Sequence, residues 1–139
     1  MITPALRSQL LQAARQVLEK AYAPYSRFRV GAALLTRQGG IFSGANVENA
    51  SYGLTLCAER AAVAQAVAAE GPGLEIRALA VVSESQEACP PCGACRQVIL
   101  EFGREALIIF QGPAGPVDMA LGELLPLGFH LTVGGKKPE

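Results

Sequence analysis

Two groups of cysteines, far apart in the chain, place the strongest constraint on how it can fold. The first group is Cys57-Ala58-Glu59, and the second is Pro91-Cys92-Gly93-Ala94-Cys95. Side chains three residues apart share one face of a helix, so Cys92 and Cys95 can hold one metal ion together. Cys57 lies near the start of a different expected helix. The fold therefore has to bring two helix N-termini to one point, where their free N–H groups and dipoles favour thiolates.

The compartment in which the chain works decides how these cysteines are used. The first residues lack the charged and apolar pattern of a secretory signal, and no run of about 18 apolar residues indicates a membrane span. We therefore expect a cytoplasmic protein with no membrane partner, in which the four cysteines stay reduced. Reduced, clustered cysteines indicate a metal site or catalysis before disulfides.

Length and charge narrow the class of protein further. A chain of 139 residues predicts a single domain over residues 1–139, with a loose tail at residues 134–139. The net charge is zero and there is no basic stripe, so nucleic acid is not an expected partner. Half of the residues are hydrophobic and only 17% are charged, which leaves an oligomer and an ordinary Ala-rich monomer about equally favoured.

Hydrophobic periodicity and turn residues predict alternating helices and strands. The expected architecture is one sheet covered by helices, an α/β fold in the order α-β-β-α-β-α-β-β followed by a helical turn. The expected helices cover residues 6–21, 57–70 and 93–102. The expected strands cover residues 28–36, 41–45, 76–83, 106–110 and a short stretch near Val117, and the final turn covers residues 121–125.

Three thiolates would leave a tetrahedral zinc ion with one open position, where water can bind and ionise near neutral pH. Glu59, two residues from Cys57, is a poor fourth ligand but can move protons between water and a substrate. Zinc with three thiolates is net negative, so a donor to a thiolate is needed. Arg60 can be that donor, or equally a surface arginine, and Arg96 is a weaker candidate.

Other interpretations of the cysteines remain open at this point. Cys-x-x-Cys also occurs in redox sites and structural zinc sites. Cys89 forms a second, overlapping Cys-x-x-Cys pair with Cys92, so four cysteines could close a structural site. Against this, Pro90-Pro91 force an extended chain, which should carry Cys89 away from the face shared by Cys92 and Cys95.

The motif Cys-Ala-Glu followed by Pro-Cys-x-x-Cys is close to the signature of zinc deaminases that act on bases, where His usually stands first. With the rest of the chain, it resembles the homotetrameric cytidine deaminase family from about Tyr22 to Phe129. The resemblance is carried by Pro24-Tyr25-Ser26, Phe28, Val30-Gly31-Ala32-Ala33-Leu34, Asn46-Val47-Glu48-Asn49-Ala50, Cys57-Ala58-Glu59-Arg60, Pro91-Cys92-Gly93-Ala94-Cys95-Arg96-Gln97-Val98 and Glu123-Leu124-Leu125-Pro126.

This resemblance implies a three-layer α/β/α sandwich around a five-stranded mixed sheet. It implies hydrolytic deamination of cytidine and deoxycytidine in pyrimidine salvage, by zinc-bound hydroxide with Glu59 as proton shuttle. One zinc ion per chain would be held by Cys57, Cys92 and Cys95, and Cys89 departs from the family pattern. The resemblance also implies a homotetramer with shared active sites, and it assigns the substrate contacts. Asn46 and Glu48 would bind the ribose, Phe28 would pack against the base, Ala58 would be a further substrate-binding residue, and Phe129 would close a neighbouring subunit's pocket.

Rival functions are distinguished by particular features. Deaminases of polynucleotides usually have His in place of Cys57 and need a basic surface, which this chain lacks. Two further functions fit the cysteine pattern: deamination of an unusual cytosine nucleoside, and a zinc-stabilised binding module without turnover. His130, the only histidine, is expected at the surface and not as a ligand.

Overall fold

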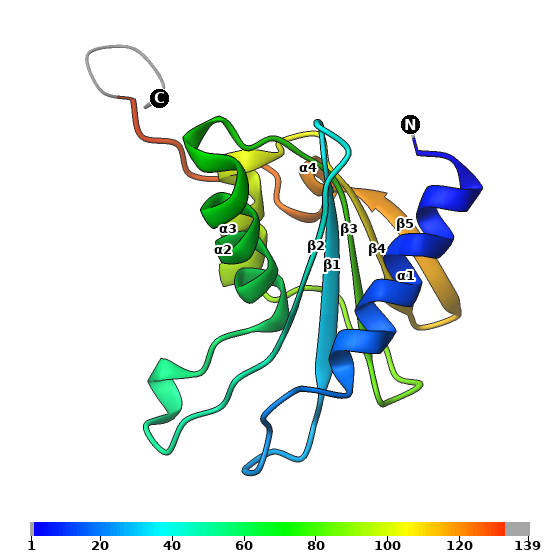
Figure 1. The fold of residues 1–139 in the computed structure, drawn as a ribbon, viewed down its shortest axis with the longest axis vertical. Coiled ribbons are helices and arrows are strands. Elements are labelled where there is room, and N and C mark those ends of the chain that lie inside the picture. Colours follow the sequence, from blue (N-terminus) through cyan, green and yellow to red (C-terminus); the bar gives the residue numbers. More distant parts are fainter. Residues whose placement is uncertain (1, 133–139) are drawn as a thin grey trace.

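A five-stranded mixed sheet runs through the centre of the protein, with helices on both faces (Figure 1). The computed structural model describes residues 2–132, and the tail predicted at residues 134–139 lies outside them. The sheet order is β2-β1-β3-β4-β5. The strands are β1 (Val30–Thr36), β2 (Ile41–Ala45), β3 (Ile76–Ser83), β4 (Leu107–Gly112) and β5 (Gly115–Ala120). The helices are α1 (Pro4–Leu18), α2 (Ala58–Glu70), α3 (Gly93–Phe102) and α4 (Leu121–Leu124), with short 3-10 turns at Tyr52–Leu54 and Gly71–Gly73.

The direction of each strand follows from its connection. Strand β1 pairs antiparallel with both β2 and β3, whereas β3 and β4 are parallel because α3 crosses over between them. Strand β1 lies between β2 and β3, and all its residues after Val30 are buried. Its apolar sequence, without polar alternation, is what a strand covered on both faces requires.

Each face of the sheet has its own hydrophobic core. Ala32 and Leu34 of β1 point to the core beneath α2 and α3, while Ala33 and Leu35 point to the core beneath α1. In Figure 1, α1 lies on one side of the sheet and α2 and α3 lie on the other. The predicted α/β/α sandwich around a mixed five-stranded sheet is therefore confirmed, whereas the single-domain boundary stays a prediction.

Gly44 sets the position of α2 on the sheet. A Cβ atom at this residue of β2 would lie 2.4 Å from the backbone N of Ala62 and 2.7 Å from the Cβ of Ala61. Real Cβ atoms do not approach other atoms so closely, so only glycine permits this packing. The backbone of α2 therefore rests directly on the backbone of β2.

Several element ends differ from the expected ones by one to three residues, among them the end of α1 and the start of β1. Helix α1 ends at Leu18 and not at residue 21, and strand β1 begins at Val30 and not at Phe28. The carbonyl of Phe28 accepts a hydrogen bond from the side chain of Asn46, which keeps Phe28 out of the sheet ladder. Within the described residues, no helix combines the length and the apolar character needed to cross a membrane.

Candidate active site

The two cysteine groups meet at the neighbouring N-termini of α2 and α3, which begin at the same end of the molecule (Figure 1). Cys57 and Cys92 are the N-cap residues of these helices, and Cys95 lies in the first turn of α3. The Sγ atoms of all three lie within 4.8 Å of one another, and those of Cys92 and Cys95 are 3.4 Å apart. Cys57 is half-buried, Cys92 is exposed and Cys95 is buried.

These three thiols fit a zinc ion. Two thiolates bound to tetrahedral zinc at about 2.3 Å would be roughly 3.8 Å apart, which lies within the observed spacing. The surroundings also favour ionisation of Cys57. A hydrogen bond from the Cys95 thiol, together with the nearby Arg60, lowers the pKa of Cys57 to about 5. The pKa of Cys95 is raised, because it donates to Cys57 and because it is buried.

Cys89 lies outside this group. The group of three metal-binding side chains consists of Cys57, Cys92 and Cys95. The N–H of Cys89 donates to the carbonyl of Gln111 on β4 at 2.8 Å, and its side chain is half-buried, with a pKa raised by burial. This placement agrees with the effect expected of Pro90-Pro91.

Glu59 is the buried carboxyl group beside the thiols. It lies in the first turn of α2, two residues after Cys57, with little exposed surface. Burial, and then the negative charge of Cys57, raise its pKa. A carboxyl group with a raised pKa binds a proton more readily than an exposed one and can pass that proton on.

Arg60 contacts the thiol of Cys57, as the sequence suggested. Its Nη2 donates to Cys57 Sγ at 3.3 Å and to the carbonyl of Thr55 at 3.4 Å. Arg96, the weaker candidate, instead donates to the carbonyls of Pro91 and Leu124, both at 2.8 Å, and thereby ties the start of α3 to α4.

One of the two expected ribose-binding residues, Glu48, borders a hollow of about 320 Å³. Glu48 lines this hollow together with Tyr25, Ser26, Tyr52 and Thr55. Its Oε1 accepts from the backbone N–H groups of Tyr25 and Ser26, at 2.9 and 3.1 Å. Hydrogen bonding from Ser26 lowers the pKa of Glu48, so this carboxylate stays charged.

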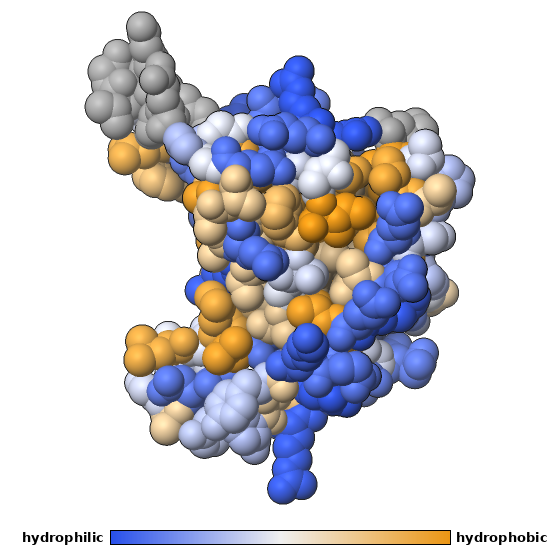
Figure 2. Space-filling view, in the orientation of Figure 1, coloured by the Kyte–Doolittle hydropathy of each residue, from blue (hydrophilic) through white to orange (hydrophobic). Residues whose placement is uncertain are grey.

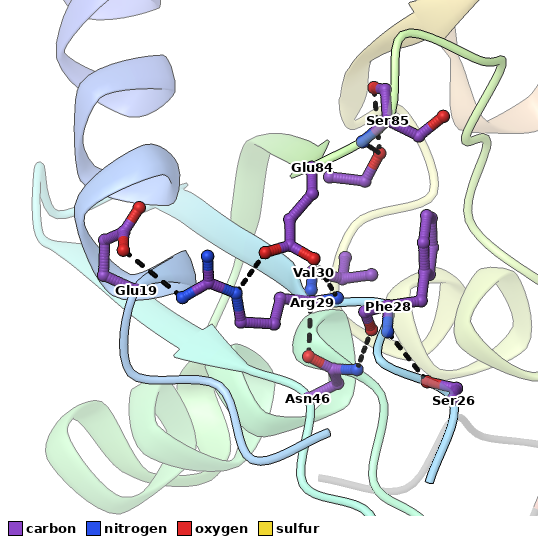
Figure 3. A network of polar contacts seen from close by, with 9 residues as sticks. Glu19, Ser26, Phe28, Arg29, Val30, Asn46, Glu84 and Ser85 are labelled. Atoms are coloured by element: carbon purple, nitrogen blue, oxygen red, sulfur yellow. Dashed lines mark hydrogen bonds and ion pairs between the residues drawn. The ribbon is translucent and has the colours of Figure 1, made fainter. Parts of the chain in front are cut away.

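Asn46 is buried and supports the chain around Phe28 (Figure 3). Its Nδ2 donates to the Phe28 carbonyl at 2.8 Å, and its Oδ1 accepts from the N–H of Val30 at 2.9 Å. Phe28 itself is 40% exposed, so its ring is available to a ligand. Ala58 is fully buried between Cys57 and Glu59, with no exposed surface.

Phe129 lies apart from these residues, on the C-terminal segment, and is 68% exposed. The side chain of Gln97, on α3, holds it by two hydrogen bonds. Gln97 Nε2 donates to the Phe129 carbonyl at 2.8 Å, and Gln97 Oε1 accepts from its N–H at 3.1 Å. Gln97 belongs to one of the motifs that carry the family resemblance, but it lies far from Phe129 in the sequence. No pattern in the sequence therefore indicated this contact. His130 is exposed beside Arg104, as expected.

A zinc ion held by three thiolates, next to a carboxyl group that is not a ligand, is the arrangement by which zinc deaminases remove amino groups from nucleobases. Fold and site thus place the chain in the class of zinc-dependent hydrolytic deaminases. Residues 5–111 match the cytidine and deoxycytidylate deaminase zinc-binding region, and the chain belongs to this family.

Individual relatives agree with this assignment. The cytidine deaminase of Halalkalibacterium halodurans is 47% identical over 125 residues, covering 88% of this chain and 93% of the relative. The cytidine deaminase of Mycobacterium tuberculosis is 50% identical over 118 residues, covering 85% of each chain. The crystal structure of cytidine deaminase from Burkholderia pseudomallei superposes with a TM-score of 0.81 at 47% identity, covering 92% of this chain and all of the other.

Proposed function

We propose that the protein hydrolyses cytidine and deoxycytidine to uridine and deoxyuridine, releasing ammonia, and that it serves pyrimidine salvage in the cytoplasm. The observation that carries the proposal is the group of three thiols with the buried carboxyl group of Glu59 beside it. The relatives named cytidine deaminase support the choice of substrate, because their similarity extends over most of the chain.

Cys57, Cys92 and Cys95 would hold one zinc ion per chain. When bound, zinc supplies a Lewis acid that lowers the pKa of water, so that water becomes nucleophilic near neutral pH. Arg60 donates to the Cys57 thiolate and offsets part of the negative charge of three thiolates.

Glu59 moves the protons of the reaction. It takes a proton from the water that attacks C4 of the cytosine ring and delivers it to N3. It then transfers a second proton to the amino group, because ammonia leaves only from a protonated nitrogen. Water thus supplies the oxygen of uridine, and its hydrogens end on the ring and on ammonia.

The remaining residues would bind the nucleoside. Asn46 retains one amide hydrogen beyond the one bound to Phe28, and Glu48 has a second carboxylate oxygen, so both can bind ribose hydroxyls. Phe28 would pack against the base, and Ala58 would lie beneath the substrate between Cys57 and Glu59. Because Glu48 stays charged, it would repel a phosphate group near the sugar.

Exposed apolar side chains support a homotetramer with shared active sites. Figure 2 shows apolar surface on the C-terminal segment and on the loop before α2, on either side of a concave edge. The exposed residues there are Leu127, Phe129 and Leu131 on the C-terminal segment and Tyr52, Leu54 and Leu56 before α2. A second copy would cover this surface, and Phe129 would then close the neighbour's pocket.

The test is to follow the absorbance of cytidine and the release of ammonia with the purified protein, alongside metal analysis. We expect one zinc ion per chain and turnover of cytidine and deoxycytidine that a chelator abolishes. One zinc ion per chain without ammonia release would contradict the proposal and support a zinc-stabilised binding module.

A further inference from the structure

Side chains, and not the sheet, hold the backbone around Phe28. The Phe28 N–H donates to Ser26 Oγ at 3.0 Å, and the Phe28 carbonyl is held by Asn46 (Figure 3). The preceding Arg27 has a φ of 56°, a left-handed conformation that costs free energy for a residue with a side chain. The position of Phe28 therefore depends on the residues that anchor this segment.

Arg29 is anchored from the opposite side by Glu84. Val30 is paired with Ser83 in the antiparallel ladder of β1 and β3, so Arg29 and Glu84 form the next pair. The Glu84 N–H donates to the Arg29 carbonyl at 3.3 Å, as in a regular ladder. The Arg29 N–H, however, donates to the carboxylate Oε2 of Glu84, also at 3.3 Å.

The same carboxylate forms an ion pair with the Arg29 side chain, whose Nε donates to Glu84 Oε1 (Figure 3). The two side chains are 36% and 32% exposed, so the pair is partly shielded from solvent. Glu19, just after α1, adds a second carboxylate 3.3 Å from Arg29 Nη1. Arg29 is thus bound through its backbone and its guanidinium.

Glu84 also begins the segment that leads to the metal-binding cysteines. It follows the last residue of β3, and the chain turns there because the N–H of Ser85 donates to Ser83 Oγ at 3.3 Å. Residues 84–91 then run to Cys92. The backbone hydrogen bonds and the ion pair of Arg29 with Glu84 therefore connect the segment that carries Phe28 to the segment that leads to two of the three thiols.

We propose that Arg29 and Glu84 are positioning residues that hold Phe28 at the place from which its ring packs against the base beside the metal-binding thiols. This inference rests on the proposed function, in which Phe28 contacts the base. A misplacement of about 1 Å in a group that positions the substrate can cost as much as 10²-fold in catalysis.

The experiment is a double-mutant cycle. We expect Glu84→Ala to raise the KM for cytidine roughly three- to tenfold, with a smaller change in kcat, because charge-assisted bonds in a partly shielded pair are lost. In a Phe28→Leu background the same substitution should change KM by less than about twofold, because residues that act through one another are not additive. An unchanged KM, or the same factor in both backgrounds, would overturn the inference.

Glu75→Ala is the matched control. It removes the Arg37–Glu75 ion pair, whose side chains are 73% and 57% exposed and which lies away from Phe28. Its effect on KM should stay within about twofold in both backgrounds, as for an exposed pair. If Glu84→Ala does not fold, Glu84→Gln, which has the same shape without the charge, is measured against the same criteria.

Backbone hydrogen exchange tests the anchor without any turnover. In Glu84→Ala the amide of Arg29 loses its acceptor, so it should exchange faster, while the amides of β2 should not change. Unchanged exchange at Arg29 and Val30 would overturn the inference whatever the kinetics. Absence of turnover in the unaltered zinc-loaded protein would instead contradict the proposed function, and exchange would still decide the role of Glu84.

Discussion

The hydrogen bond from Arg60 to Cys57 should determine how well the metal site works, and Arg60→Gln tests this. The guanidinium makes one bond to Cys57 Sγ at 3.3 Å and a longer one to the Thr55 carbonyl at 3.4 Å. Its Nε is buried and has no hydrogen-bond partner within residues 2–132. The hydrogen bond to the Cys57 thiolate therefore explains why the guanidinium group of Arg60 lies beside the cysteines.

The size of the effect follows from that one bond. A hydrogen bond to a charged group contributes about 1.5–3 kcal/mol, and each 1.36 kcal/mol is a factor of ten. Loss of the bond should therefore lower kcat/KM, zinc affinity or both by roughly 10- to 100-fold, the range usual for partners of metal ligands. The hydrogen bond to the Thr55 carbonyl has a neutral acceptor and is long, so its loss should contribute little to this decrease.

The assay follows cytidine absorbance and, in parallel, zinc retention against a graded chelator. Arg37→Gln is the control, because it removes a guanidinium from an exposed ion pair distant from the cysteines. We expect that control to stay within about twofold of the unaltered protein. An Arg60→Gln variant that also keeps both catalytic efficiency and zinc affinity within about twofold would refute the role of this hydrogen bond.

Four further predictions concern the same site. Glu59→Gln should retain zinc and lose a factor of about 10² or more in kcat, measured by ammonia release, because proton transfer is lost; near-normal turnover would disprove its role. Cys89→Ser should bind one zinc ion per chain and stay active, and metal loss would indicate a four-cysteine site instead. Deoxycytidine should be a better substrate than its monophosphate, because of the charged Glu48; equal efficiency argues against this. Mixing Glu59→Gln subunits with Phe129→Ala subunits should restore activity if Phe129 acts across an interface, whereas mixtures no better than their parents after verified exchange would exclude it.

The sequence could predict those features that depend on local pattern. The apolar run of β1 indicated a strand, and the Cys-x-x-Cys spacing placed Cys92 and Cys95 on one helix face. The contacts of Arg29 with Glu84 and of Gln97 with Phe129 could not be predicted. They join a side chain to the backbone or charge of a residue far along the chain, and such pairs follow no periodicity.

The strand boundary at Phe28 shows the same limit. An apolar residue just before an apolar strand favours an extension of that strand, and the expected strand began there. In the structure, the Phe28 carbonyl accepts a hydrogen bond from the side chain of Asn46, a residue that lies one strand further along the chain. The approach of Asn46, and not local propensity, decides which residues enter the ladder.

The contact between Gly44 and the backbone of α2 affects how this protein can vary over evolution. Side chains in an interface can adopt other rotamers when a neighbour is substituted, so helices that rest on side chains drift in position as their cores change. Helix α2 meets β2 through main-chain atoms, which have no rotamers to exchange. Substitutions elsewhere in the core can therefore accumulate without moving Cys57 and Glu59, while any side chain at Gly44 itself would push α2 off β2 and displace both of them.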